Sequence, residues 1–225
     1  MNLTYEGECM SYKYIDMSTY KRKSHFDYFN KLAIPHVGVT VNIDITDFLK
    51  VLKKNKCPFF LSLCYCVTRA ANGVKEFRQR IIDDKIIEFD QCFSTHTLAL
   101  EDETYCYCKL DPNLPYFEYL PHSLKAQEEA KKRNTIKESR EDKLQGFFIS
   151  CVPWISYSAL INPMPIPADS NPRITRGKYF EENGKLKIPI STLCNHAIVD
   201  GLHISKFYEN LEREIADLTN LIKNK

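Results

Sequence analysis

Two segments of the chain alternate between apolar and polar residues, as a β-strand with one buried face does. They are residues 36–46 and 185–196. Apolar residues in 201–221 instead recur every three or four positions, which predicts a helix with one buried stripe. On the second strand, one face carries Leu186, Ile188, Ile190, Thr192, Cys194 and His196. We therefore expect His196 to face a core or cleft, where the strand passes into the helix.

The rest of the chain continues this mixture of helix and strand patterns. Residues 57–74 are apolar all round and predict a buried helix, while 116–143 predict an exposed helix interrupted near Pro121. Four prolines make 161–173 irregular. Further strands are expected in the segments 77–89 (two, around a turn at Asp83–Asp84), 93–100, 103–110, 146–160 and 174–180. We predict an α+β fold with a mixed sheet, in a single domain spanning 1–225.

The composition and the motifs argue against several classes of function. The net charge is +2 with scattered lysines and arginines, which does not suit a nucleic-acid-binding face. Neither phosphate-loop nor dinucleotide-binding glycine motifs occur, and no run of about 18 apolar residues suggests a membrane span. Nine cysteines without an export signal favour a reducing cytoplasm. We interpret Cys64/Cys66 and Cys106/Cys108 as buried thiols and expect no metal site.

His196 and Asp200 are the residues that invite a chemical interpretation. A histidine titrates near neutral pH and acts as a general base when one ring nitrogen is held in place. A hydrogen-bonded core histidine is the other interpretation of His196, and Asp200 suits the N-cap of the last helix. Local spacing leaves a His–Asp catalytic pair open, and it assigns neither Cys151 nor Cys194 to it as a nucleophile.

The stretch "HAIVDG" resembles the H-x-x-x-D-G signature of the CoA-dependent acyltransferases, and most closely that of the chloramphenicol O-acetyltransferase family. Five other segments are similar to that family in the same order and spacing: "YKRKSHFDYF", "EFRQRIIDDKIIEFD", "LEDETYCY", "FFISCVPWISY" and "ITRGKYFEENGKLKIPIS". The similarity extends over nearly all 225 residues. It implies the family's fold, a large mixed sheet flanked by helices.

The resemblance also implies roles for individual residues. His196 matches the general base that deprotonates the acceptor hydroxyl, with its ring held partly by its own backbone carbonyl. Ser150 matches the serine that stabilises the tetrahedral oxyanion, and Thr175 matches a threonine that holds a water. Asp200 matches an aspartate that pairs with an arginine, here Arg22, and supports the site without touching the base.

Binding residues follow from the same resemblance. Lys178, Tyr179 and Trp154 match positions lining the CoA site, while Phe29 and Tyr105 match the aromatic wall around the acceptor. The co-substrate implied is acetyl-CoA, the acceptor is chloramphenicol, and no bound cofactor is expected. The family forms homotrimers with active sites at subunit boundaries, so we expect the base of one chain to face a pocket built largely by the next.

The sequence departs from the family pattern at several points. Asn195 replaces the first of two histidines, so the turn needs another form of structural support there. Tyr20 replaces an N-terminal tryptophan, and residues 109–134 and 161–173 follow the family only loosely. Acetyl transfer is therefore better supported than the acceptor.

Three alternatives stay open at this point. One is the same chemistry on another hydroxylated acceptor. Another is the acyltransferase core of a 2-oxo acid dehydrogenase complex, although Ala197 stands where that motif has arginine. The last is a catalytically inactive trimeric binding module.

Overall fold

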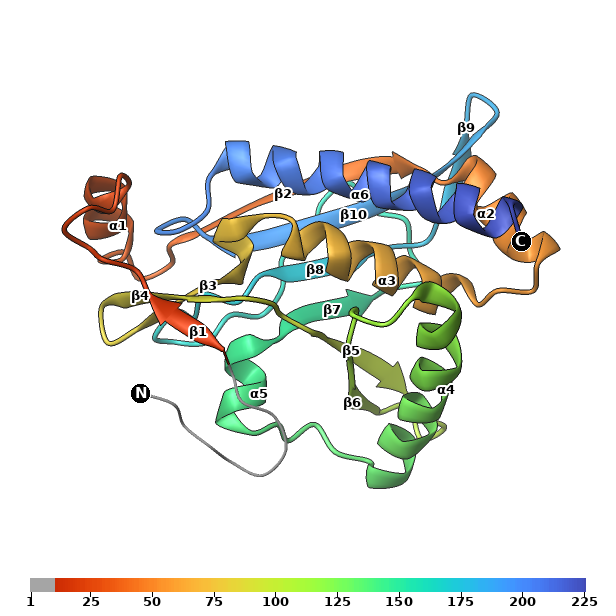
Figure 1. The fold of residues 1–225 in the computed structure, drawn as a ribbon, viewed down its shortest axis with the longest axis horizontal. Coiled ribbons are helices and arrows are strands. Elements are labelled where there is room, and N and C mark those ends of the chain that lie inside the picture. Colours follow the sequence, from red (N-terminus) through yellow and green to blue (C-terminus); the bar gives the residue numbers. More distant parts are fainter. Residues whose placement is uncertain (1–10) are drawn as a thin grey trace.

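The computed structural model describes residues 11–225, which form two sheets and a set of helices (Figure 1). The strands are β1 (Tyr12–Tyr14), β2 (His36–Asp44), β3 (Gln79–Ile82), β4 (Lys85–Phe89), β5 (Ser94–Ala99), β6 (Tyr105–Leu110), β7 (Phe147–Cys151), β8 (Arg173–Arg176), β9 (Phe180–Glu182) and β10 (Lys185–Asn195). The helices are α1 (Lys23–Phe29), α2 (Thr46–Lys54), α3 (Phe59–Asn72), α4 (Tyr116–Arg133), α5 (Arg140–Gln145), α6 (Gly201–Lys223) and the short 3-10 helix η1 (Lys75–Arg78).

The larger sheet has the strand order β2-β10-β8-β7-β5-β6, and β9 forms a hairpin with β10. It is mixed, because β7 runs parallel to β5 and β8 whereas β10 is antiparallel to its neighbours. The smaller sheet, β1-β4-β3, lies at one end of the molecule (Figure 1). This architecture confirms the predicted α+β fold with a mixed sheet and helices.

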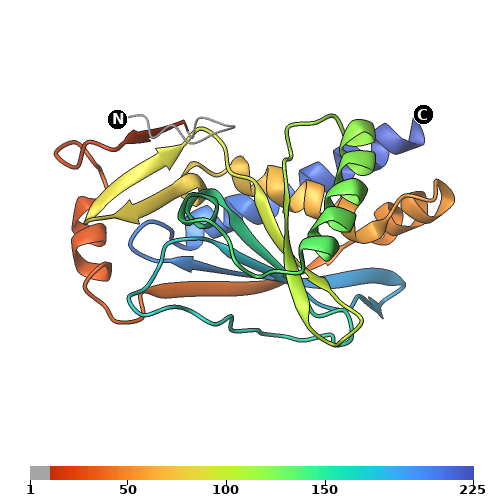
Figure 2. The same cartoon turned by 90° about the horizontal axis from the view of Figure 1, so that it is seen from below.

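The longer helices α2, α3, α4 and α6 lie on one face of the large sheet, and the segment 152–172 runs along the opposite face (Figure 2). Alternation along β10 explains this. Its residues Ile188, Ile190 and Cys194 are fully buried in the core beneath the helices. No described helix is long and apolar enough to cross a membrane.

The helix at 116–143 is the clearest error of the sequence prediction. Pro121 lies inside α4 without interrupting it, and the helix ends instead at Arg133, where Asn134 adopts the left-handed conformation. Pro121 stands close to the helix start, so its missing N–H removes a single internal hydrogen bond. Residues 134–139 are not helical, and α5 follows them.

A fully buried histidine beneath the helices gives the fold a testable pH dependence. His96 on β5 lies 3.1 Å from the Gln127 side-chain nitrogen, and burial lowers its pKa from 6.5 to about 4. Because the folded-state pKa lies below the unfolded value, this stability is present above pH 6.5 and is lost as the pH falls towards 4. The loss should reach about 3 kcal/mol.

Denaturant unfolding of the variant His96→Gln between pH 7 and pH 4 checks this, because glutamine keeps a polar partner for Gln127 and does not titrate. Its free energy of unfolding should fall less steeply with acid than that of the wild type. The exposed His122→Gln serves as the control and should follow the wild-type curve. If the free energy of unfolding of His96→Gln and of the wild type fell equally with acid, the lowered pKa of His96 would not be the cause of the pH dependence.

Candidate functional site

The turn between β10 and α6 holds His196 in a defined orientation. β10 ends at Asn195, one residue earlier than predicted, so His196 stands half-buried in the turn. Its backbone N–H donates to the carbonyl of Pro35 at 2.6 Å, and its ring Nδ1 lies 2.8 Å from the carbonyl oxygen of Val199. The ring is therefore held by the carbonyl of Val199, and the expected bond to its own carbonyl is not the one that the structure shows.

This contact fixes the tautomer of His196. A carbonyl oxygen only accepts hydrogen bonds, so Nδ1 must carry the proton. In the neutral ring, Nε2 then keeps its lone pair. The geometry leaves His196 with a basic nitrogen directed away from its anchor, which is what a general base requires.

Helix α1 supports this turn along one of its faces. Arg22, Phe26 and Phe29 follow the i, i+4, i+7 spacing, so they lie on the same side. The Phe29 ring packs on the His196 ring at 4.0 Å between centroids, with 30° between the planes. Phe26 is buried against Ala197, the next residue of the turn. Residues of this short helix and its N-cap therefore contact the turn at both of its ends.

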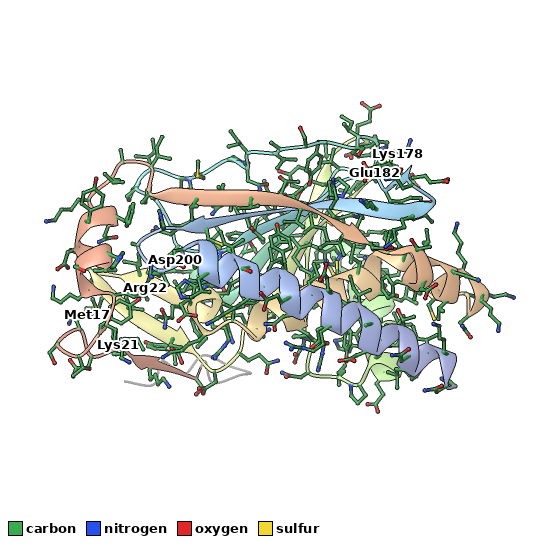
Figure 3. All side chains as sticks on the ribbon, turned by 90° about the horizontal axis from the view of Figure 1, so that it is seen from above. Met17, Lys21, Arg22, Lys178, Glu182 and Asp200 are labelled. Atoms are coloured by element: carbon green, nitrogen blue, oxygen red, sulfur yellow. The ribbon has the colours of Figure 1, made fainter. Side chains whose placement is uncertain are left out.

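Arg22 and Asp200 form the pair that the resemblance implied. Nη1 of Arg22 donates to Oδ2 of Asp200, and both side chains are partly buried (Figure 3). Burial alone would raise the pKa of Asp200, but the hydrogen bond and charge of Arg22 and the nearby His203 outweigh it and lower the pKa. Oδ1 of Asp200 accepts from the N–H of Leu202 at 3.0 Å, so this carboxylate is also the N-cap of α6. Asp200 makes these contacts rather than one with the His196 ring.

Asn195 supports the turn from inside. Its Oδ1 accepts from the N–H of Ala197 at 3.0 Å, and its Nδ2 donates to the carbonyl of Asp169 at 3.0 Å. The side chain is 3% exposed. The substitution noted in the sequence thus keeps the turn braced and ties it to the segment 152–172.

Ser150 and Thr175 lie on the helix-free face of the sheet. They are register partners on β7 and β8, and Thr175 is opposite Ser191 on β10. Thr175 is 1% exposed and donates from Oγ1 to Oδ1 of Asn162 at 3.1 Å. Tyr157 donates to the carbonyl of Thr175 at 2.7 Å. These bonds fix the segment 152–172 over the two hydroxyl groups, and Asn162 is a contact that the sequence did not predict.

Trp154, Lys178 and Tyr179 are brought together where β8 ends. The N–H of Lys178 donates to the carbonyl of Ile155 at 2.8 Å, which joins the two segments that carry these side chains. Trp154 is 74% exposed, whereas Tyr179 is 37% exposed and meets Phe59 edge-on at 6.1 Å between centroids. The segment 152–172 also passes close to Gly177. A Cβ at that position would lie 2.8 Å from the Tyr157 ring, so a larger residue would not fit there without a shift.

Within one chain these groups form two separate clusters. Lys178 lies at one end of the molecule, and Arg22 and Asp200 lie at the other (Figure 3). Ser150 is two strands away from β10, at the level of Ser191, and His196 follows Ser191 by five residues. Strand dimensions place Ser150 about 15–20 Å from His196. Tyr105 is farther still from His196, because β6 is the opposite edge strand.

The cysteines form a third group, which lies mostly in the core. Burial raises the pKa of the Cys64 and Cys66 thiols on α3, and it raises the pKa of Cys108 to about 12. All three are free thiols. Residues 11–225 contain no cluster of three side chains suited to a metal ion.

The sequence did not predict that His203 and Glu76 contact the site. His203 is the third residue of α6, and its ring accepts a hydrogen bond from the N–H of Asp200 at 3.0 Å. The spacing of three from an N-cap aspartate was a usable signal, although glutamate or glutamine normally fills that place.

Comparison with known proteins identifies the family of the chain. The family model described as chloramphenicol acetyltransferase matches residues 10–212. A chloramphenicol acetyltransferase of Klebsiella sp is 27% identical over 211 residues, which cover 92% of this chain and 95% of that relative.

Two solved structures share the fold. A chloramphenicol acetyltransferase superposes with a TM-score of 0.84 at 20% identity, covering 91% of this chain and 100% of the other. A probable dihydrolipoamide acetyltransferase from Listeria monocytogenes gives a TM-score of 0.63 at 16% identity, with coverage of 90% and 93%. The family match spans most of the sequence, and the chain belongs to the chloramphenicol acetyltransferase family within the CoA-dependent acyltransferase superfamily.

Proposed function

We propose that this chain is one acetyltransferase domain, residues 1–225, that transfers an acetyl group from acetyl-CoA to a hydroxyl of chloramphenicol. The observation that carries the proposal is the bond from His196 Nδ1 to the Val199 carbonyl, which leaves Nε2 as a free base. A histidine serving only the core would be expected to bury its ring fully, whereas His196 is only half-buried.

The chemistry is a direct transfer in a ternary complex. His196 Nε2 takes the proton of the acceptor hydroxyl as its oxygen attacks the thioester carbonyl. The tetrahedral intermediate carries a negative oxygen, to which the Ser150 hydroxyl donates, and Thr175 accepts from a water beside it. The intermediate then collapses, the C–S bond breaks, and the CoA sulfur receives the proton from His196.

Binding of acetyl-CoA falls to the cluster at the end of β8. The Lys178 ammonium suits the phosphates, and the exposed rings of Trp154 and Tyr179 offer faces for adenine. Phe29 and Tyr105 supply aromatic walls for the acceptor. No residue of this set requires a metal ion.

The separation of the two clusters supports an oligomer, and the resemblance to the family makes a homotrimer the form that we propose. A general base must approach within about 3 Å of the proton that it takes. His196 and Ser150 of one chain stand about 15–20 Å apart along the sheet, so they do not meet at the same intermediate. Two chains bring them together when the His196 turn of one faces Ser150 of its neighbour, and in a homotrimer like those of the family this contact would be repeated three times.

One contact beside Thr175 is compatible with a second acceptor class. Arg173 precedes Thr175 by two residues on the same face of β8 and is bound by both oxygens of Asp169 at 2.7 Å. The Arg173 side chain is nearly buried, so the pair makes the surroundings of the hydroxyl groups polar without leaving an unpaired charge. Polar groups near a reacting hydroxyl occur in chloramphenicol and in other small alcohols, and another alcohol of this kind is the second acceptor class.

Release of free CoA thiol from acetyl-CoA by the purified protein tests the proposal. Chloramphenicol-dependent release supports the first acceptor. Release with another alcohol, and not with chloramphenicol, supports the second. Release with dihydrolipoamide alone would point to the dehydrogenase-complex activity instead. Absence of release with every alcohol tested would overturn acetyl transfer and leave the chain as a binding module.

A further inference from the structure

The peptide unit between Val199 and Asp200 is hydrogen-bonded to a different histidine on each side. Its carbonyl oxygen accepts from His196 Nδ1 at 2.8 Å, and its N–H donates to His203 Nδ1 at 3.0 Å. In a planar trans peptide these two groups point in opposite directions. The tilt of one peptide plane therefore sets the position of the His196 ring, and His203 holds that plane from the far side.

The tautomer of His203 follows from the same contact. Its Nδ1 accepts a hydrogen bond, so the proton of the neutral ring is on Nε2. Nε2 faces Oε1 of Glu76 on η1 at 3.6 Å, and the side chain is 8% exposed. His203 thus stands between the peptide of the turn and a carboxylate from another element.

Several charges face the His203 ring. Burial lowers its pKa, and Arg22 and Lys206 lower it further, whereas Glu76 and Asp200 oppose the shift. Tyr20 also lies close to the Glu76, Arg22 and Asp200 groups. The net effect keeps the imidazole neutral at pH 7, the state in which Nδ1 can accept.

We propose that His203 is a positioning residue for His196, because it fixes and polarises the peptide whose carbonyl holds the His196 ring. Donation of the Asp200 N–H to His203 makes the Val199 carbonyl a stronger acceptor, since hydrogen bonds in a chain polarise one another. That carbonyl keeps the proton on Nδ1 of His196 and leaves Nε2 basic. The consequence for turnover rests on the proposed function, but the tautomer of His196 does not.

Protonation of His203 at acid pH would change its hydrogen bond to the Asp200 N–H. A protonated Nδ1 on His203 no longer accepts from the Asp200 N–H, and it donates instead to Oδ1 of the same aspartate, 3.1 Å away. The peptide then loses its far-side anchor. Protonation of His203 should therefore by itself loosen the hold on the His196 ring and contribute to the loss of activity in acid.

Nitrogen-15 NMR of the histidine rings tests the positioning without any assay of turnover. We expect His196 to be the Nδ1–H tautomer in the wild type and in His203→Gln, because the side-chain oxygen of the introduced glutamine can accept from the Asp200 N–H as in an ordinary capping box. In His203→Ala we expect a mixture of both tautomers. His122→Gln, an exposed change, is the control. Unchanged His196 shifts in a folded His203→Ala would overturn the proposal.

Kinetics provide the second measurement, if acetyl transfer is found. His203→Ala should lower kcat about ten- to a hundredfold without changing the KM for acetyl-CoA. His203→Gln should restore kcat at neutral pH and should lose less activity than the wild type as the pH falls, because glutamine does not titrate. An acid limb in His203→Gln identical to that of the wild type would contradict the proposal, and it decides the matter even if His203→Ala fails to fold.

Discussion

Replacing His196 with alanine should lower the rate of acetyl transfer about 10²- to 10⁴-fold, the range that a positioned general base contributes. The remaining groups still bind both substrates, but the acceptor hydroxyl stays protonated and attacks poorly. The KM for acetyl-CoA should change little, because Lys178 lies at the opposite end of the chain from the Arg22–Asp200 pair beside His196 (Figure 3), and the segment carrying Trp154 is hydrogen-bonded to Lys178. Steady-state thiol release at pH 7.5 measures the change.

Stability of the same variant distinguishes the two interpretations of His196. The ring is half-buried and is held by one hydrogen bond through Nδ1. Its loss should cost about 1 kcal/mol, so the folded oligomer should persist. The exposed His25→Ala on α1 is the control for both assays. An unfolded His196→Ala protein would support the core-histidine interpretation. A fully active one would show that His196 is not the general base.

Ser150→Ala should reduce kcat about 10²- to 10³-fold, equivalent to about 2.7–4 kcal/mol of transition-state stabilisation. The hydroxyl donates to an oxygen that becomes negative only in the intermediate, so substrate binding should be nearly unaffected. Ser150 is partly exposed and has Thr175 as its register partner, so the change leaves the sheet intact.

The measurement for Ser150 compares kcat and both KM values with those of the exposed Ser156→Ala, which should behave as the wild type. A large rise in KM with kcat unchanged would assign Ser150 to substrate binding. Unchanged kcat and KM would remove it from the site altogether.

The sequence predicted those parts of the molecule that are governed by periodic burial. Alternation along 185–196 and the three- and four-residue spacing after Gly201 located β10 and α6, because a sheet covered by helices on one face enforces both patterns. Asp200 was also correctly interpreted as an N-cap, since its side chain satisfies a free N–H of the helix. The pairing of Arg22 with Asp200 came from the resemblance alone, as the two residues are far apart in the sequence.

The contacts inside the turns and irregular segments could not be predicted from the sequence. The Val199 carbonyl reaches His196 because of the backbone angles of residues 196–199, which no hydrophobic pattern encodes. Asn162 meets Thr175 because the proline-rich segment folds back over the sheet, and that path has no periodicity. Pro121 was misjudged because its effect depends on its distance from the helix start, which was not known.

The central claim is that His196 of one chain serves the Ser150 site of another, and mixed oligomers test it most directly. His196→Ala and Ser150→Ala chains, each nearly inactive alone, are unfolded together, refolded in equal amounts and assayed for thiol release. Random assembly gives about a quarter of the chain contacts an intact His196 facing an intact Ser150, so activity should return to about a quarter of the wild-type value. A mixture no more active than its two components, with mixed oligomers demonstrated by mass, would contradict the claim.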